Sequence, residues 1–447
     1  MFLFLAVLVT LLGSAEAIKI AAVTGLGTSS EVSALQKALA LDPGNPLLHN
    51  RLSQVYGDSL EHTNPTEAYE EARQATALNP HKSDYWLTLA SACESVSNIA
   101  CADQAFERAL ELSPLVPQVW WDAGNHYLRT DRPEAALRCF HRLLQLSPDL
   151  AGPTFALTLG AYGDPKMILE KVVGDEKDPD VGLAFADFMS AHNQFDAAHQ
   201  AWTQISTGGA WFPFTAVQPY LERLLSQGRY QEAQTLWSNL EVRGVIAKPA
   251  DSEPGNLLFN GGFEQLPLGA GLDWRSAASS YVSVDFADAS AYAGAHCLRV
   301  DFPIGQNDEF EPVSQILPVV ANQTYTLTAY VRSRDITSDS GPRLRVVDAD
   351  CPSCLDVSSD TTVSSTPWHM LTLKFSTGPH TQAVRISLWR PRSRVFPMEI
   401  SGTFWLDAVS VRADINNQPH GAVAAVSDRR SALREYRYNS FSRAEQP

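Results

Sequence analysis

Four short motifs recur along the first third of the chain at nearly constant spacing. Leu41-Asp-Pro43, Leu78-Asn-Pro80, Leu112-Ser-Pro114 and Leu146-Ser-Pro148 follow one another at intervals of 37, 34 and 34 residues. A fixed period of this length indicates stacked supersecondary units, because one such unit cannot bury its apolar face alone. The proline that ends each motif cannot continue a helix, so each unit closes with a turn. The chain is therefore expected to begin with a helical repeat array.

The units between these motifs resemble tetratricopeptide repeats. One unit has Trp86, Leu89, Ala90, Ala102, Phe106, Ala109 and Pro114, and the next has Trp120, Ala123, Gly124, Tyr127, Ala136, Phe140, Leu143 and Pro148. Small residues let the two helices of a unit approach closely, and the apolar stripe of each helix faces its neighbours. The resemblance implies about five helix pairs over residues 31–245, a right-handed superhelix and a groove that binds a protein or peptide.

Two sets of residues in this array invite different interpretations. We interpret Trp86, Trp120, Trp202 and Trp237 as packing residues of the core. Polar positions on the first helices give the candidate groove residues Asn50, Gln54, Asp122 and Asn125. A solvated helix face has the same pattern, so the sequence leaves both interpretations of the polar set open.

The pattern changes from helical to alternating beyond a turn-rich linker at residues 246–255. Residues 324–332 and 384–390 carry apolar side chains at every second position. Short alternating segments separated by Gly, Pro, Asn and Ser predict an antiparallel β-sandwich over residues 256–413. The whole chain is thus predicted to be an α + β multidomain protein, with an all-α superhelix followed by a sandwich of jelly-roll type.

Three segments of the second half resemble the jelly-roll carbohydrate-binding modules of the family 4/9 and 22 type. They are residues 256–264 with Trp274, residues 325–333 and residues 404–411. The resemblance implies a structural calcium near the first and last strands, at the matching positions Glu264 and Asp407. Carboxylate oxygens are ligands that suit Ca²⁺. The alternative is that Glu264 caps a turn and Asp407 pairs with an arginine.

The polar sides of two predicted strands offer a carbohydrate site at Tyr330, Arg332, Arg385 and Trp389. Sugar binding needs a flat aromatic surface together with polar groups that fix orientation. A loop that covers Trp389 would remove this surface, and that alternative stays open. Trp274 and Trp405 are interpreted as core residues.

The six cysteines fit an oxidising compartment. Cys351 and Cys354 are predicted to form a local disulfide, because neither a strand-to-helix redox setting nor a second pair of zinc ligands accompanies them. Cys93 and Cys101 flank a helix turn and are a second candidate pair. Cys139 and Cys297 are predicted to be buried thiols.

The N-terminus reads as a secretory signal over residues 1–17, with an apolar run to Leu12 and a small-x-small cleavage pattern at Ala15-Glu16-Ala17. An uncleaved membrane anchor is the alternative, although the run is shorter than the roughly 20 residues that a spanning helix needs. No later segment is long and apolar enough to span a membrane. Residues 414–447 are polar and are predicted to form a flexible tail.

The charge and the missing motifs narrow the function. The formal net charge is −16, with most of the acidic excess before residue 256, which disfavours nucleic acid as a partner. The nucleophile-elbow, zinc-protease and phosphate-loop motifs are absent from the sequence. We therefore predict an exported, non-catalytic adaptor that holds a protein and a polysaccharide, in surface polysaccharide assembly or export. The alternatives are a pure protein scaffold with a structural sandwich and a glycan-active enzyme.

Overall fold

The computed structural model describes residues 16–58, 63–174, 179–250, 253–277, 282–396 and 398–414. The apolar run of the predicted leader and the predicted tail from residue 415 lie outside these residues. The chain divides into two compact units, Met1–Ala210 and Trp211–Pro447. None of the described helices combines the length and the apolar character needed to cross a bilayer.

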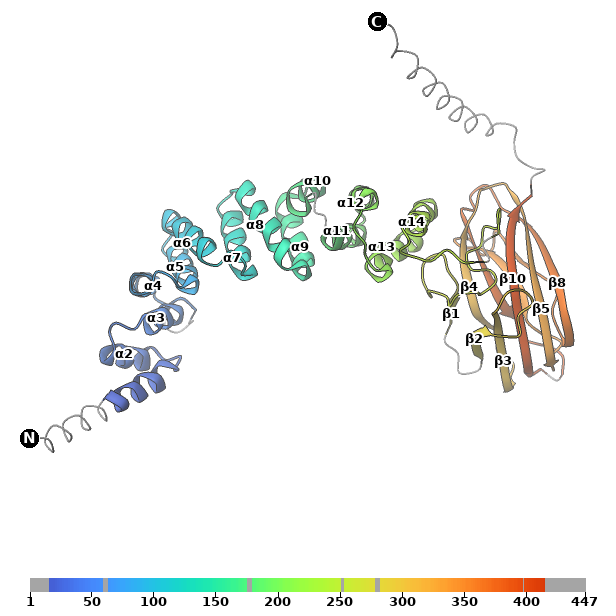
Figure 1. Cartoon of the computed structure of the whole chain (residues 1–447), viewed down its shortest axis with the longest axis horizontal. Helices are drawn as coiled ribbons and strands as arrows, with labels where there is room; N and C mark the ends of the chain where they lie inside the picture. The colour runs from blue at the N-terminus through green and yellow to red at the C-terminus, as the bar shows by residue number, and fades with distance from the viewer. Residues whose placement is uncertain are drawn as a thin grey trace, which may run out of the picture. The chain divides into compact units, whose positions relative to one another are not determined.

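The first unit consists of antiparallel helix pairs that follow one another in chain order (Figure 1). After a helical segment at residues 16–27 come α2 (Val32–Leu41), α3 (Pro46–Asp58), α4 (Pro65–Leu78), α5 (Ser83–Ser95), α6 (Ile99–Leu112), α7 (Pro117–Arg129), α8 (Pro133–Leu146), α9 (Ala151–Tyr162), α10 (Pro165–Ile168), α11 (Pro179–Ala191) and α12 (Phe195–Thr207). A 3-10 turn at Pro148–Leu150 and a π-helical turn at Leu169–Val173 interrupt the series. The predicted helical repeat array is confirmed.

Small residues set the close approach of the paired helices. Gly124 of α7 faces the ring of Phe140 on α8, and a Cβ at this position would lie 2.7 Å from a ring carbon. Ala102 and Ala136, the matching small residues of the second helices, are fully buried. The positions that suggested the repeat in the sequence are therefore those at which the helices touch.

A ring contact recurs at the start of three successive first helices. The indole N–H groups of Trp86 and Trp120 each donate a 2.9 Å hydrogen bond to the proline carbonyl six residues earlier. His49 makes the same 2.9 Å contact in the preceding unit. Trp86 and Trp120 are only half-buried, whereas Trp202 and Trp237 are 3% and 4% exposed. The core interpretation thus describes the last two, while the first two also fix the turn between units.

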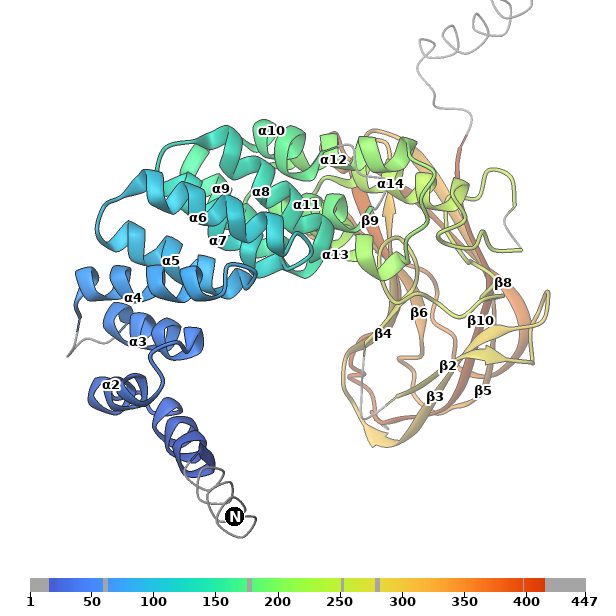
Figure 2. The same cartoon turned by 60° about the vertical axis from the view of Figure 1, so that its left-hand side comes forward.

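In its described residues the second unit contains two helices and two five-stranded antiparallel sheets. The helices are α13 (Phe214–Ser226) and α14 (Tyr230–Val242). One sheet has the order β1 (Arg275–Ser276), β4 (Phe310–Pro318), β9 (Ala383–Arg390), β6 (Arg343–Asp348) and β7 (Asp356–Ser358), and we call it the β9 sheet. The other, the β5 sheet, has the order β2 (Ser283–Asp288), β3 (Cys297–Gln306), β10 (Ile400–Ala413), β5 (Thr324–Ile336) and β8 (Ser364–Ser376). Their layers are visible in Figure 2, and the predicted sandwich is confirmed.

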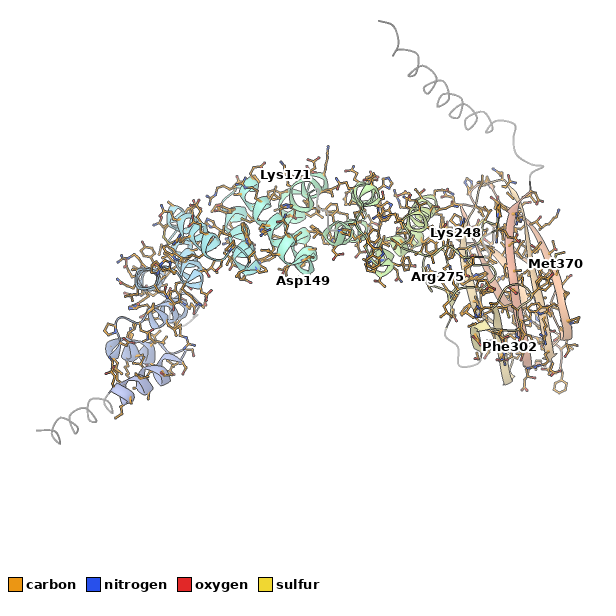
Figure 3. All side chains as sticks on the ribbon, in the orientation of Figure 1. Asp149, Lys171, Lys248, Arg275, Phe302 and Met370 are labelled. Atoms are coloured by element: carbon orange, nitrogen blue, oxygen red, sulfur yellow. A yellow bond between two sulfur atoms is a disulfide. The ribbon has the colours of Figure 1, made fainter. Side chains whose placement is uncertain are left out.

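Alternate residues of these strands fill the space between the sheets. On β5 the inward residues are Tyr325, Leu327, Ala329 and Val331, and they meet Val384, Ile386 and Leu388 of β9 within one core. Figure 3 labels Phe302, a core residue of β3, and Met370, which is 55% exposed on the outer side of β8. The intervening residues of each strand therefore point away from the core and form two outer faces.

The helix pair α13–α14 packs directly on the sandwich. The ring of Trp237 lies edge-on to Phe259, with centroids 5.0 Å apart. Glu222 accepts 2.8 Å and 2.9 Å hydrogen bonds from Arg275 at the start of β1, where Figure 3 labels the arginine. Tyr230 donates a 2.7 Å hydrogen bond to Asp350. Helices give way to strands across the predicted linker, but the compact unit begins earlier, at residue 211.

A buried carboxyl makes the stability of this unit depend on pH. Asp273 is 0% exposed, and burial raises its pKa to about 6 despite hydrogen bonds from the N–H groups of Leu268 and Trp274. Because the folded pKa lies above the unfolded value near 3.9, the stabilisation is complete below pH ~4 and is lost as pH rises through about 6.

Asp273→Asn removes this titration. We expect the free energy of unfolding of wild type, relative to the variant, to fall by about 2 kcal/mol between about pH 4.5 and about pH 7.5. Urea titrations of both proteins at the two pH values measure the difference. A difference that is constant with pH would contradict the assignment.

Candidate binding sites

The four predicted carbohydrate residues belong to two different surfaces. Tyr330 and Arg332 lie on β5, and Arg385 and Trp389 lie on β9. The two strands are in opposite sheets, and each pair points outward from its own sheet. The structure therefore does not bring the four residues together, because the core separates the two pairs.

The surface around Trp389 contains an indole between charged groups. We call it the Trp389 surface, and it comprises Glu309, Glu311, Arg343, Arg345, Arg385, Ser387 and Trp389. The guanidinium carbons of Arg345 and Arg343 lie 4.4 Å and 5.6 Å from the centroid of the Trp389 ring. The indole N–H donates a 2.8 Å hydrogen bond to Glu309. Trp389 is half-buried rather than covered, so the ring is accessible to a ligand.

The positive and negative side chains of the Trp389 surface are similar in number, but not every pair of them forms a hydrogen bond. Arg345 donates two hydrogen bonds, of 2.8 Å and 2.6 Å, to Asp356, and this contact raises the pKa of Arg345. Arg385 Nε lies 3.6 Å from Glu311 Oε1, too far for a hydrogen bond. Burial lowers the pKa of Arg343. The surface therefore presents both donors and acceptors with little net charge.

Several buried polar atoms of the Trp389 surface have no hydrogen-bond partner among the described residues. They are Arg343 Nε, Arg385 Nε, Glu311 Oε1 and Ser387 Oγ. A buried polar atom without a partner costs about 1–3 kcal/mol, so such atoms are rare unless a ligand or water satisfies them. Two of them, Arg385 Nε and Glu311 Oε1, face each other at 3.6 Å on the outer side of the β9 sheet, which also carries the Trp389 indole.

The outer face of the β5 sheet carries a second group, which we call the Trp405 surface and define as Arg332, Arg334, Trp368 and Trp405. The guanidinium carbons of Arg332 and Arg334 lie 4.7 Å and 5.4 Å from the centroid of the Trp405 ring. Trp405 was interpreted as a core residue, and it is 3% exposed. Its neighbours Phe404 and Leu406 enter the core, however, so Trp405 lies on the outer face, beneath the two arginines. Tyr330 stacks nearby on Tyr292, with ring centroids 3.6 Å apart.

The two predicted calcium ligands, Glu264 and Asp407, both contact the loop at residues 292–296. Asp407 Oδ2 accepts hydrogen bonds of 2.8 Å and 3.0 Å from the N–H groups of Tyr292 and Ala293. Glu264 accepts from Ala295 at 2.9 Å. Burial raises the pKa of Asp407, and the nearby charge of Glu264 raises it further against those hydrogen bonds.

Glu264 and Asp407 are two neighbouring carboxyl groups, of which Asp407 is fully buried, and carboxylate oxygens are ligands of the kind that a calcium ion prefers. Glu264 also caps the loop, as in the alternative interpretation, whereas Asp407 has no arginine partner among the described residues. No group of three or more His, Cys, Asp or Glu side chains that could hold a metal occurs in the described part of the chain.

The predicted groove residues separate into three environments. Asp122 and Asn125 line one hollow of about 440 Å³ between α5 and α7, together with Leu87, Ser91, Glu94, Phe106, Trp121 and Arg129. Gln54 lines another, of about 470 Å³, with Arg51 and Asp58. Asn50 is only 5% exposed and lines neither hollow. Burial raises the pKa of Asp122, which accepts a 2.8 Å hydrogen bond from Gln118.

A buried histidine that sequence reasoning did not single out links three helices beside the first hollow. His126 of α7 is 0% exposed, and its two ring nitrogens lie 2.6 Å from Glu94 of α5 and 2.7 Å from Asp103 of α6. Arg129 and Arg132 contact the same two carboxylates. The full burial of the His126 ring indicates that this residue joins neighbouring repeats by packing. Only the contact across helices, which no local pattern shows, could have identified it.

Two disulfides lie within the described chain. Cys93 joins Cys101, and Cys351 joins Cys354. The first closes the turn between α5 and α6, next to Glu94. The second closes the loop after β6. Cys139 and Cys297 are free and buried, and burial raises the pKa of each thiol to about 12. These are the pairs and the thiols that the spacing indicated.

Among curated proteins, part of this chain is similar in sequence to a repeat protein. No protein-family profile matches the chain. A stretch of 90 residues is 37% identical to tetratricopeptide repeat protein 33 of Mus musculus, over 20% of this chain and 33% of that protein. The chain thus spans about a third of the length of this curated relative.

Solved structures are similar to parts of the chain. The crystal structure of MamA is 14% identical, over 44% of this chain and 90% of that one, with a TM-score of 0.26. A CBM4 structure is 14% identical, over 35% of this chain and 99% of that one, with a TM-score of 0.26. The module called Family 16 Carbohydrate Binding Module-2 is 19% identical over the same shares, with a TM-score of 0.25. The first half of the chain is a helical repeat array that is similar to a tetratricopeptide repeat protein over the 90 matched residues, and the second half contains an antiparallel sandwich of two sheets.

Proposed function

We propose that this chain is an exported, non-catalytic adaptor that holds a protein partner in its helical array and binds a glycan at the Trp389 surface. The observation that carries the glycan proposal is the set of buried polar atoms without partners beside a half-buried indole. A glycan ring would stack on Trp389, and its hydroxyl groups would accept hydrogen bonds from the guanidinium groups of Arg343 and Arg385. The proposed setting is the assembly or export of a surface polysaccharide.

Trp389→Ala tests the glycan site. We expect the full chain to bind at least one polysaccharide in affinity gels and calorimetry, and the variant to bind it at least tenfold more weakly, about 1.4 kcal/mol. Trp211→Ala is the matched control, because Trp211 is 71% exposed in the same unit and should leave binding unchanged. Failure of the wild-type chain to bind any polysaccharide would favour the pure scaffold, and release of cleaved sugars would show an enzyme.

The protein partner is assigned to the hollow between α5 and α7. Its lining combines the indole of Trp121 with an ion pair in which Arg129 contacts Glu94 at 2.8 Å. A photo-crosslinking residue at Asn125 should label a partner that the same residue at Arg108, exposed on α6, does not label. Equal labelling from both positions would contradict a groove-specific contact.

Calcium at Glu264 and Asp407 is proposed as a structural ion. At a Ca²⁺ concentration 100 times its Kd, the stability of the second unit should rise by about 2.7 kcal/mol. Glu264→Gln with Asp407→Asn should abolish this gain, which scanning calorimetry with and without chelator measures. The gain should also vanish in acid, because the raised pKa of Asp407 leaves it protonated. Equal stabilisation by Mg²⁺ would contradict a calcium site.

Export is proposed from the N-terminal pattern and from the two disulfides, which persist in oxidising compartments. Cell fractionation of the full chain, compared with one lacking residues 1–17, tests it. Retention of the full chain in a reducing compartment would contradict export.

A further inference from the structure

We propose that the Trp405 surface is a second binding site, for an acidic sugar residue that carries a carboxylate or sulfate group. This site lies on the sheet opposite the Trp389 surface and does not depend on it. It would make the sandwich a receptor for an anionic polysaccharide chain.

Two arginines without partners carry this proposal. The guanidinium groups of Arg332 and Arg334 have no hydrogen bond or ion pair among the described residues. Elsewhere in the sandwich, carboxylates lie within 3.4 Å of the guanidinium groups of Arg299, Arg345, Arg392 and Arg412. In a chain with a formal net charge of −16, two adjacent unneutralised arginines form a local site for an anion.

The indole beneath these arginines holds them in place. Trp405 is 3% exposed, and both guanidinium groups lie over its ring at 4.7 Å and 5.4 Å. Such stacking restricts the planar groups while leaving their N–H donors available, and those donors match the geometry of a carboxylate or sulfate. The N–H of Trp405 is itself buried without an acceptor in the described part of the chain. The site therefore has more donors than acceptors.

A hollow beside the arginines supplies the space for a sugar ring. Its volume is about 440 Å³, and it is lined by Arg332, Ser333, Arg334, Ser365, Thr366, Pro367 and Trp368. This volume lies within the range of about 300–1,000 Å³ that small-molecule sites occupy. Trp368 is half-buried and offers an aromatic surface for the C–H face of a sugar, next to the guanidinium groups. An aromatic surface beside two guanidinium groups that donate hydrogen bonds to an anion fits an acidic sugar better than it fits a free inorganic anion.

The decisive comparison uses polymers that differ only in charge. Polygalacturonate and its methyl ester share one backbone, as do dextran sulfate and dextran. We expect the full chain to bind one or both acidic polymers and to bind the matching neutral polymer at least tenfold more weakly. Long-range repulsion from the acidic chain opposes this preference, so it can only come from a local site.

Arg332→Gln with Arg334→Gln should weaken binding of the acidic polymer at least tenfold. The control is Arg392→Gln with Arg394→Gln, which removes the same charge from an exposed loop and should change binding less than twofold. Arg332→Lys with Arg334→Lys keeps the charge but loses the planar guanidinium groups that stack on Trp405, and this variant should bind with intermediate affinity. Trp389→Ala should leave this binding unchanged, which separates the proposal from the function proposed above.

Three results would overturn the proposal. The first is an equal loss of binding in the double variant at positions 332 and 334 and in the control double variant at positions 392 and 394. The second is equal affinity for the charged and neutral polymers. The third is no binding of either acidic polymer by the wild-type chain. Binding of a single-stranded oligonucleotide through the same arginines, without binding of the acidic polymers, would reject the sugar assignment. Circular dichroism of each variant shows whether a loss reflects misfolding.

Discussion

Arg390→Ala should lower the free energy of unfolding of the second unit by about 4 kcal/mol. Arg390 is 0% exposed at the end of β9, and its guanidinium donates to the backbone carbonyls of Asp308, Ser340 and Met398 at 2.7 Å, 3.0 Å and 2.9 Å. It also donates to the side chain of Asn307 at 3.2 Å. Truncation would leave these acceptors unpaired, at about 1–3 kcal/mol for each that water cannot reach. Chemical denaturation of the two proteins measures the loss.

Arg392→Ala is the matched control, because its side chain is 68% exposed and its one ion pair with the described residues is the 3.3 Å contact with Asp308. We expect this change to cost less than about 1 kcal/mol. Arg390 also fixes the segment that precedes Glu309, the acceptor of the Trp389 indole. Arg390→Ala should therefore weaken glycan binding as well as stability. Equal effects of the two alanine variants would show that Arg390 does not hold these loops together.

Trp237→Ala should destabilise the same unit by about 3–5 kcal/mol, because it removes the side chain that joins α14 to the sandwich. The ring is 4% exposed and contacts Phe259 and Phe214 edge-on, at centroid distances of 5.0 Å and 6.0 Å. It also packs so tightly on Gly271 that a Cβ there would lie 2.3 Å from a ring carbon. No small rearrangement can fill the cavity, so thermal unfolding should shift clearly.

Trp211→Ala, at a 71% exposed position, is the comparison for Trp237 and should have almost no effect. The same packing predicts that a fragment starting at residue 211 is more stable than one starting at residue 251. Fragments of equal stability would show that α13 and α14 are dispensable for the sandwich.

The sequence was sufficient for the helices, for the strands and for the outward direction of their side chains. The repeat spacing locates the small residues at Gly124 and Ala136, and period-two alternation correctly turns Arg332 and Trp389 away from the core. Alternation is a property of one strand, however, and carries no information about which sheet the strand joins. Strands β5 and β9 enter different sheets because their partners come from distant parts of the chain.

The missed features all depend on contacts between distant segments. Asn50 has the polarity of a groove residue but is buried by the neighbouring helix pairs. Trp405 alternates with the core residues Phe404 and Leu406, so its outward position could have been predicted from the sequence. The two arginines that cover it come from another strand, and the sequence does not show this contact. The buried Nε of Arg343, which has no hydrogen-bond partner among the described residues, is likewise a property of the assembled sandwich.

Both cystine bridges span very little of the chain, 8 and 3 residues. Each cysteine therefore meets its correct partner early, because the partner is synthesised only a few residues later. The remaining thiols at Cys139 and Cys297 become inaccessible once their surroundings fold. The chain should reach its native pairing without reshuffling by an isomerase. Loops this short restrict the denatured ensemble little, so reduction should lower the melting temperature less than opening a long-range crosslink would.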